Sequence, residues 1–374
     1  RYLTMSEIKV NSIKGVGATN AAITVNNTDG TCTANISSIN GGQISGRRNM
    51  IINGDQRVAQ RGTAAVTVDG NAGYRSVDRF KTDIDNTGNG DWSHGQSTDV
   101  PTGQGFTNSS KITVVTQASQ PSGTSTNHEF YTMLEKQDVA HLEWGTSAAK
   151  TCTISFWVKS SVTGTYSFFF KHYAPTNYSY YTSYTINSAD TWEKKVITVT
   201  GHTSGGNVSG TTDVGLLFMW SLGNSSGNET GTLNEWTTSG TRRAPAGSVY
   251  LPENSGATWY ITGVQFEVGS QASDFEFRSV AEETILCQRY YFGGATTGSA
   301  YYGSRYSTDR SMVHVVFPCL MRTIPTVETP PIGGLTGSGA LNTIYESNHM
   351  VYYYVNADTS VFVAHADVKC DAEL

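Results

Sequence analysis

The chain has 374 residues, of which 15% are charged and 11% aromatic, with 39 Gly and 20 Tyr. Such an aromatic content excludes a wholly disordered, highly charged chain. Scarce charge and abundant Gly and Tyr disfavour helical bundles and coiled coils. The formal net charge of −6 gives no sign of a nucleic-acid partner. The composition therefore predicts an all-β protein with many polar loops.

The sequence predicts neither membrane insertion nor a secretory signal. The longest apolar stretches, residues 214–220 and 312–320, are far shorter than the ~20 residues that a spanning helix needs. The first ten residues are polar and mixed, unlike a signal peptide. Met5 and the residues after it resemble an ordinary cytosolic start, so we expect Arg1–Thr4 to lie upstream of the natural initiator.

The five cysteines are scattered, and no two have the close spacing of a zinc knuckle or a redox motif. We therefore expect reduced or buried thiols and production in a reducing cytosol. The cysteines are Cys32, Cys152, Cys287, Cys319 and Cys370.

Residues 1–46 alternate weakly between Gly- and Asn-rich breaks. These runs are too short and too polar to bury a core alone. Such a segment typically gains order from another chain, so we interpret residues 1–46 as an extended N-terminal attachment arm.

Residues 47–62 form the one locally basic segment, with Arg47, Arg48, Arg57 and Arg61 against a single acid, Asp55. The pair Ile51-Ile52 followed by Asn53-Gly54 suggests a strand that runs into a tight turn. Two interpretations stay open. The four arginines are either a solvated face at the entry of a domain or a docking surface for an acidic partner.

Residues 47–278 predict a central two-sheet jelly-roll sandwich. About eight strands are expected, separated by turn signals, and residues 151–159 place Cys152, Ile154, Phe156 and Val158 on one face. Residues 214–220 are apolar throughout, as in a strand buried on both faces. Long polar loops are expected at 86–107, 201–212 and 223–248.

A short linker helix is predicted within residues 279–292, with Ser279 as its cap, Glu282 three residues on, and Val280 and Cys287 on one face. Residues 293–374 again predict strands and form a small C-terminal β-sandwich. About 84 residues make a marginal domain, and oligomerisation would relieve this.

Five segments resemble, in the right order, the β-domains of fibre and virion structural proteins of tailed bacteriophages. They are NMIINGDQRVAQRG (49–62), VDRF (77–80), GVQFEVGSQASDFEFR (263–278), EETILCQRYY (282–291) and VFPCLMRTIPTV (316–327). The resemblance implies a virion component, often a homotrimer, whose jelly roll is similar to carbohydrate-binding modules. The sequence departs from that family in two respects. It shows no long repetitive shaft, and its N-terminal arm matches no known tail-anchoring domain.

Aromatic clusters supply the candidate sites for glycan or for contacts between subunits, since such rings suit both roles. The first cluster surrounds an expected hairpin loop at Pro175 and Asn177. The second lies in loops rich in Gly, Asn and Thr, and Phe106 and Trp220 belong with it. The third is in the C-terminal domain. The candidates are Tyr173, Tyr178, Tyr180, Tyr181 and Tyr184; Trp92 and Trp236; and Tyr301, Tyr302 and Tyr306. The alternative for each cluster is ordinary core packing.

The sequence shows no catalytic machinery and predicts no cofactor and no metal site. Asp83 with Asp85, and Glu129 with Glu135, have same-face spacing, but surface carboxylates often do. No nucleophile elbow, zinc-protease motif or complete calcium loop occurs.

The predicted function is therefore non-catalytic: a homotrimeric tail fibre or receptor-binding protein, exposed on the virion, that attaches the particle to host surface glycan. Its arm would contact other virion proteins, and trivalency would multiply weak contacts. The alternatives are a capsid-decorating fibre or tail adaptor with a structural role, a glycan depolymerase, and a secreted cellular carbohydrate-binding module.

Overall fold

The structure is a computed structural model. It describes residues 12–13, 23–25, 28, 32–34, 47–68, 70–84, 90–123, 127–229, 231–238, 244–293, 300–307, 310–328, 341–356, 361–365 and 369–374.

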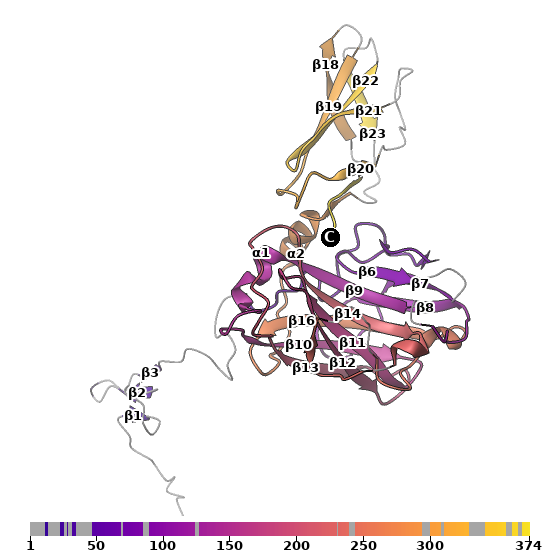
Figure 1. The fold of residues 1–374 in the computed structure, drawn as a ribbon. Helices are drawn as coiled ribbons and strands as arrows, with labels where there is room; N and C mark the ends of the chain where they lie inside the picture. Colours follow the sequence, from indigo (N-terminus) through magenta and orange to yellow (C-terminus); the bar gives the residue numbers. More distant parts are fainter. Residues whose placement is uncertain are drawn as a thin grey trace, which may run out of the picture.

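The chain is all-β, and every strand pair among the described residues is antiparallel (Figure 1). Near the N-terminus, β1 (Ser12–Ile13), β2 (Ile23–Val25) and β3 (Cys32–Ala34) form a three-stranded sheet. The rest of the predicted arm, residues 1–46, lies outside the described residues.

The central body contains a six-stranded and a seven-stranded sheet. The first consists, from edge to edge, of β13 (Glu193–Thr200), β10 (Thr151–Ser160), β16 (Thr258–Val268), β8 (Ser109–Thr116), β7 (Asp91–Ser97) and β4 (Val66–Val68). The second consists of β15 (Trp236–Thr237), β12 (Tyr178–Ile186), β11 (Gly164–His172), β14 (Val214–Asn224), β9 (Asn127–Glu135), β6 (Lys81–Ile84) and β5 (Gly73–Tyr74).

The two sheets pack face to face on one apolar core. The Phe156 ring of β10 lies 5.4 Å from that of Trp220 in β14 and 6.1 Å from that of Phe168 in β11. From β8 onward the chain crosses between the sheets at most connections, which is the pattern of a jelly roll. The predicted common face of β10 is confirmed, because Cys152, Ile154, Phe156 and Val158 are all buried in the core.

The body has more strands than the eight expected, because several short strands lie in stretches that are rich in Gly and Asn. The loop predicted at 86–107 contains β7. No strand precedes the turn at Asn53 in the described residues, although the turn itself is present and closed by a hydrogen bond from the Gln56 amide to the Asn53 carbonyl.

Helices are few and short. They are α1 (Lys136–Val139), α2 (Val280–Gln288) and the 3-10 turns η1 (Ala140–Leu142), η2 (Ser226–Asn228) and η3 (Leu251–Glu253). Among the described residues, neither α-helix has the length and apolar content that crossing a membrane requires. Ser279 caps α2 by accepting a hydrogen bond from the Glu282 amide, as predicted. Of the two residues placed on one face of this helix, Cys287 is buried and Val280 is exposed.

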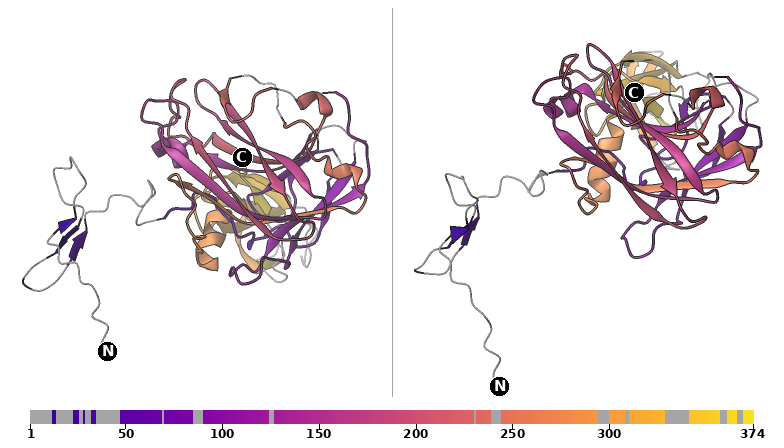
Figure 2. Two further views of the ribbon diagram at one scale, coloured as in Figure 1. Left: turned by 90° about the horizontal axis from the view of Figure 1, so that it is seen from below. Right: turned by 60° about the horizontal axis from the view of Figure 1, so that its bottom comes forward.

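The C-terminal part stands on the body through a three-stranded sheet of β17 (Tyr291–Phe292), β24 (Lys369–Asp371) and β20 (Thr326–Glu328). Beyond it lies a five-stranded sheet of β21 (Leu341–Glu346), β22 (Met350–Asn356), β19 (Arg310–Val316), β18 (Ala300–Ser307) and β23 (Val361–His365). Figure 2 shows the body from below, with these strands behind it. The proposed boundaries at 278 and 292 stay predictions.

The last residues return to the body. The buried guanidinium of Arg79 pairs with Glu373, donates to the Met133 carbonyl (2.7 Å) and lies 3.4 Å from the ring centroid of Tyr290. Arg61 pairs with Asp371 and lies over the Tyr291 ring. We call these contacts of Arg61 and Arg79 with residues 371–373 the C-terminal latch.

Candidate functional site

The predicted tyrosine-rich hairpin is present: β11 and β12 pair directly, and residues 173–177 connect them. Tyr184 points into the core, where its hydroxyl accepts a hydrogen bond from the Trp259 indole (3.2 Å). Tyr180 packs against the same core and is half-buried. Tyr181 points to the opposite face and is also buried. Neither Tyr181 nor Tyr184 offers an open ring.

Tyr181 belongs to a row across the outer face of the seven-stranded sheet. Cross-strand pairing aligns this outer row as Tyr181, Phe169, Met219, Tyr131, Lys81 and Tyr74. The first four side chains are only 4–8% exposed, and Leu233 and Leu374 pack against them. The outer row therefore forms a second small apolar layer.

Tyr178 lies at the end of the hairpin, in a cluster with Trp236. Its ring stacks on His202 at 4.1 Å, and the ring of Trp236 lies 5.0 Å from His202. The Trp236 indole donates to the Thr200 carbonyl (2.7 Å). Both rings are half-buried, so each has one side occupied by its neighbours.

A buried histidine pair supports this cluster. His202 Nδ1 lies 2.7 Å from the Ser204 carbonyl, which can only accept, so its Nε2 accepts from His172 Nδ1 at 2.8 Å. Burial and then the neighbouring His202 lower the pKa of His172 to about 4. Burial also lowers the pKa of His202.

This pair predicts a loss of stability in acid. The folded pKa of His172 lies below its unfolded value, so the unfolded chain binds the extra proton as pH falls from about 6.5 towards 4. We expect the free energy of unfolding to fall by about 1–2 kcal/mol more between pH 7 and pH 5 in the wild type than in His172→Gln. Urea unfolding at both pH values measures this. His349→Gln, at an exposed histidine, is the control that should keep the wild-type pH dependence; an unchanged dependence in His172→Gln would contradict the assignment.

Tyr173 lines a pocket next to the hairpin turn. We call it the Tyr173 pocket. Its volume is 420 Å³, and Lys136, Asn177, Asp213 and Arg322 also line it. Lys171 lies over the Tyr173 ring at 4.7 Å. Lys136 and Asp213 pair at 3.4 Å with the Asp213 side chain 69% exposed. Hydrogen bonds from Thr211 and Lys136 lower the pKa of Asp213, which keeps it an ionised acceptor.

Arg322 brings further hydrogen-bond donors to this pocket. Its guanidinium donates to three carbonyls, those of Ala372 (2.6 Å), Glu373 (2.7 Å) and Thr212 (3.2 Å). A guanidinium has five N–H groups, so two are left after these bonds. The Tyr173 pocket thus combines an aromatic ring with an amide, a carboxylate and two cations.

Trp92 is not in a loop, and that prediction is wrong. It lies in β7 and is completely buried, because β7 runs through the Gly- and Asn-rich stretch that suggested a loop. Its ring packs edge-on against His128 at 5.2 Å. Trp220 is likewise core. Trp92 cannot meet a ligand on the surface of this structure.

The third aromatic set lies in β18. Tyr301, Tyr302 and Tyr306 all fall in this strand, which pairs with β23 and β19. Their side chains lie outside the described residues, and their proposed role stays a prediction.

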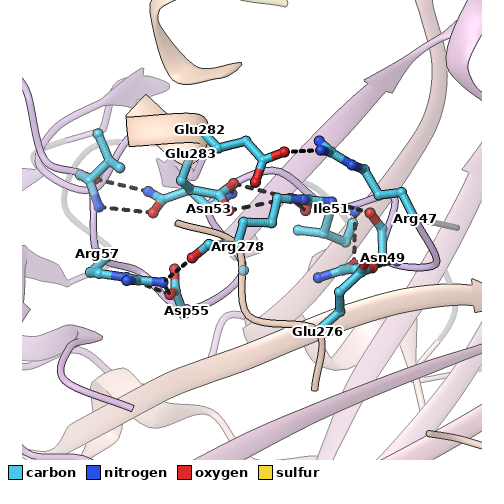
Figure 3. A network of polar contacts seen from close by, with 12 residues as sticks. Arg47, Asn49, Ile51, Asn53, Asp55, Arg57, Glu276, Arg278, Glu282 and Glu283 are labelled. Carbon is cyan, nitrogen blue, oxygen red and sulfur yellow. Dashed lines mark hydrogen bonds and ion pairs between the residues drawn. The ribbon is translucent and has the colours of Figure 1, made fainter. Parts of the chain in front are cut away.

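The basic segment is tied into the body by a polar network (Figure 3). Arg278 lies at its centre and donates to the Ile51 carbonyl (2.9 Å), to the Asn49 carbonyl and to Glu283 (3.2 Å). Asn49 in turn accepts from the Phe266 amide (3.1 Å). The start and the end of the body module are thereby held together, which gives two of the phage-like motifs a structural role.

Three of the four candidate docking arginines have side-chain partners within the chain. Arg47 pairs with Glu282, and Arg57 pairs with Asp55. Arg61 belongs to the C-terminal latch, whereas Arg48 is tied to the body through its backbone amide, which donates to Glu276 (2.8 Å). These contacts favour the interpretation as a domain entry; a docking role stays a prediction.

The carboxylates pair differently from the spacing expected in the sequence. Asp83 of β6 stands directly opposite Glu129 of β9. Glu135 instead accepts from Arg289 and from the Tyr290 hydroxyl (2.7 Å). Asp85 lies outside the described residues. Within the described part of the chain, no group of three His, Cys, Asp or Glu side chains could hold a metal ion.

Sequence reasoning missed most of the Tyr173 pocket. Lys136, Asp213 and Arg322 come from three separate parts of the chain, and none of them has a local motif. The only available signal was the hairpin itself, which pointed to Tyr173 and Asn177.

The sequence matches no family model and no curated protein. Among solved structures, the chain is similar to the enzymatically active domain of bacteriophage CBA120 tailspike protein 4, at 10% identity and a TM-score of 0.31. That match covers 59% of this chain and 21% of the other, so the chain spans about a fifth of the tailspike length.

Two further similarities are to sugar-binding proteins. A putative sugar binding protein from Bacteroides thetaiotaomicron has 14% identity and a TM-score of 0.32, covering 59% of this chain and 100% of the other. The family 11 carbohydrate-binding module of a Clostridium thermocellum cellulosomal cellulase has 13% identity and a TM-score of 0.26, covering 57% and 98%. At these scores the similarities define neither the fold nor the ligand of this chain.

Proposed function

We propose that this chain is a non-catalytic attachment protein of a virion that binds glycan on the host surface. The observation that carries the proposal is the Tyr173 pocket. A ring that lies beside an amide, a carboxylate and basic groups matches the mixed surface of a sugar, which is apolar on its ring faces and polar at its hydroxyls. The phage-like segments across residues 49–327 support the virion location.

Binding would use groups that already stand in place. Lys171 fixes the Tyr173 ring, and the ionised Asp213 accepts hydrogen bonds from hydroxyl groups. The exposed Asn177 side chain can both donate and accept. Each contact is weak, and several copies on one particle would raise the avidity without new contacts.

Tyr173→Ala is expected to weaken glycan binding about 3- to 10-fold, since an aromatic contact contributes about 0.5–1.5 kcal/mol. A glycan array first selects the ligand, and calorimetric titration then compares the variants. Thr185→Ala, at an exposed residue near the other end of β12, is the matched control and should bind like the wild type. Equal affinity of Tyr173→Ala and the wild type would exclude this pocket.

Glycan depolymerisation is the second candidate, because Asp83 and Glu129 face each other on one sheet. Glycosidases that retain configuration use two carboxyl groups roughly 5 Å apart. An assay for reducing ends on the selected glycan separates the two functions. Product release that is lost in Glu129→Gln would establish an enzyme, whereas binding without product supports attachment.

We also propose that the attachment protein is a homotrimer that forms around an apolar collar of Val280, Ile285 and Leu320. All three side chains are about half exposed. Leu320 is held beside the C-terminal end of α2, because Arg289 donates to the Leu320 carbonyl (3.2 Å). The three exposed aliphatic side chains would lose their contact with water in such an assembly, which favours association.

Val280→Asp combined with Ile285→Asp is expected to reduce the mass measured by light scattering from about three chains to one, because the charged groups would lose their water at the interface. Val196→Asp, at an equally exposed valine of β13, should leave the mass unchanged. A wild-type monomer would contradict the trimer and favour a decorating subunit or adaptor. Labelling of the arm on intact particles would then distinguish tail from capsid.

A further inference from the structure

The six-stranded sheet carries a second aromatic groove, on the face opposite to its core. The groove has a volume of 270 Å³ and is lined by Trp157 of β10, by Phe106 and by the segment that contains Asp274, Phe275 and Phe277. None of these except Phe106 belongs to the aromatic clusters of the sequence analysis. We call it the Phe277 groove.

A bulge between β10 and β16 creates the floor of the groove. Ser155 pairs with Gln265 and Trp157 pairs with Thr262, so β16 has one residue more than β10 in this interval. The extra residue of β16 is accommodated at Gly263, whose φ is +63°. A Cβ there would lie 2.5 Å from the Phe106 ring and 3.1 Å from Trp157 Cδ1. Only glycine lets both rings approach the backbone so closely.

Three phenylalanine rings form one wall. Phe106, Phe275 and Phe277 lie 4.9–5.2 Å apart in pairs. Phe106 is buried, whereas Phe277 is 47% exposed at the rim. Exposure of nearly half of a phenylalanine, beside rings that are already packed, leaves apolar area available to a ligand.

Hydrogen-bonding groups surround these rings. Lys194 and Asp274 are exposed, and within the described residues their side chains form no hydrogen bond or ion pair. The Trp157 indole N–H likewise has no partner in that part of the chain. Ser155 is buried at the base. With one cation and one anion, the lining of the groove carries no net charge.

We infer that the Phe277 groove is a second binding site, for a neutral saccharide of one or two pyranose rings. Its lining contains aromatic and polar side chains but no Leu, Ile, Val or Met. That combination suits sugar rings, which present C–H groups on their faces and hydroxyls at their edges, better than an apolar side chain of a partner protein. Its volume lies just below the ~300 Å³ at which pockets for drug-sized ligands begin.

The groove and the Tyr173 pocket lie on different sheets, so the inference does not rest on the proposed function. A chain with both sites would engage a glycan layer at two points, and occupancy of one site would raise the effective concentration of ligand at the other.

The test uses the full chain and a panel of neutral tetrasaccharides of glucose, xylose, mannose and galactose. Saturation-transfer NMR detects binding, and tryptophan fluorescence reports on Trp157. We expect at least one sugar to bind the wild type, and Phe277→Ala to weaken it about 10-fold. Lys194→Ala is a second variant of the groove. Because Lys194 is exposed, removing its side chain does not endanger the fold. Tyr173→Ala should keep this binding, which separates failure here from failure of the Tyr173 pocket.

Three outcomes would overturn the inference. The first is that no sugar of the panel binds the wild type. The second is binding that is lost in Tyr173→Ala but retained in both Phe277→Ala and Lys194→Ala. The third is that Phe277→Ala lowers the molecular mass that light scattering measures for the purified protein, which would show that the groove holds a second copy of the chain. Val115→Ala, at an exposed apolar residue of β8, should behave as the wild type throughout.

Discussion

Arg278→Met is expected to lower the free energy of unfolding by about 3–5 kcal/mol, because it leaves a buried carboxylate without its cation. Arg278 and Glu283 are both almost fully buried, and Arg278 also satisfies the carbonyls of Asn49 and Ile51. Burial already raises the pKa of Glu283 against the opposing effect of Arg278. Without that arginine the carboxyl would take up a proton, so the loss should be smaller at low pH.

Urea unfolding of the variant measures the effect, and the same network supplies its control. Glu282, the residue before Glu283, pairs with Arg47, but both side chains of this pair are at least 40% exposed. Arg47→Met should therefore change the stability by no more than about 1 kcal/mol. Similar losses in both variants would show that burial does not decide the strength of these pairs.

Arg79→Met should release the C-terminal latch. The substitution removes the shorter of the two arginine contacts of the buried Glu373, a hydrogen bond to the Met133 carbonyl and the contact with Tyr290. We expect a loss of about 3 kcal/mol, since the buried carboxylate keeps only its longer contact with Arg61 (3.4 Å). The loss of stability should be local first, because Glu373 lies two residues beyond the end of β24 and the Ala372 amide between them donates to the Tyr290 carbonyl.

Hydrogen exchange of residues 369–373 measures this local effect. Exchange in Arg79→Met should be at least 100-fold faster there than in the wild type, as a change of about 3 kcal/mol implies. Arg75→Met is the control, because within the described part of the chain the Arg75 guanidinium donates to the nearby Asn71 carbonyl alone. Unchanged exchange in Arg79→Met would mean that the pairing of β24 with β17 and β20 is enough to hold the last strand in place.

The sequence was sufficient for the long strands of the body. In β10 the residues that share the core face, Cys152, Ile154, Phe156 and Val158, could be read from their spacing, and in β14 the continuous apolar run indicated burial on both faces. The Ser279 cap of α2 was equally visible, because capping depends on neighbouring residues. Local chemistry thus predicted those elements whose own residues carry the burial pattern or the cap.

The sites were harder to predict, because they depend on distant partners. Trp92 looked like a loop residue from its Gly- and Asn-rich neighbours, yet pairing of β7 with β8 buries it. The Phe277 groove depends on a bulge at Gly263 that places Trp157 beside Phe106. Arg322 reaches the Tyr173 pocket from a segment 149 residues further along the chain than Tyr173. No rule about the spacing of residues in a sequence predicts contacts between segments so far apart.

The pairing of β17 with β24 determines how the protein would carry a mechanical load. The chain passes between the three-stranded and the five-stranded sheet four times: after β17, before and after β20, and before β24. The first and last of these strands pair through Tyr291 with Asp371 and Phe292 with Cys370. A pull on the far sheet is therefore divided among four covalent tethers. Forced unfolding follows the unfolding rate, and each tether bears only part of the tension. An attachment protein built in this way would resist detachment of its outer sheet under shear better than one with a single connecting strand.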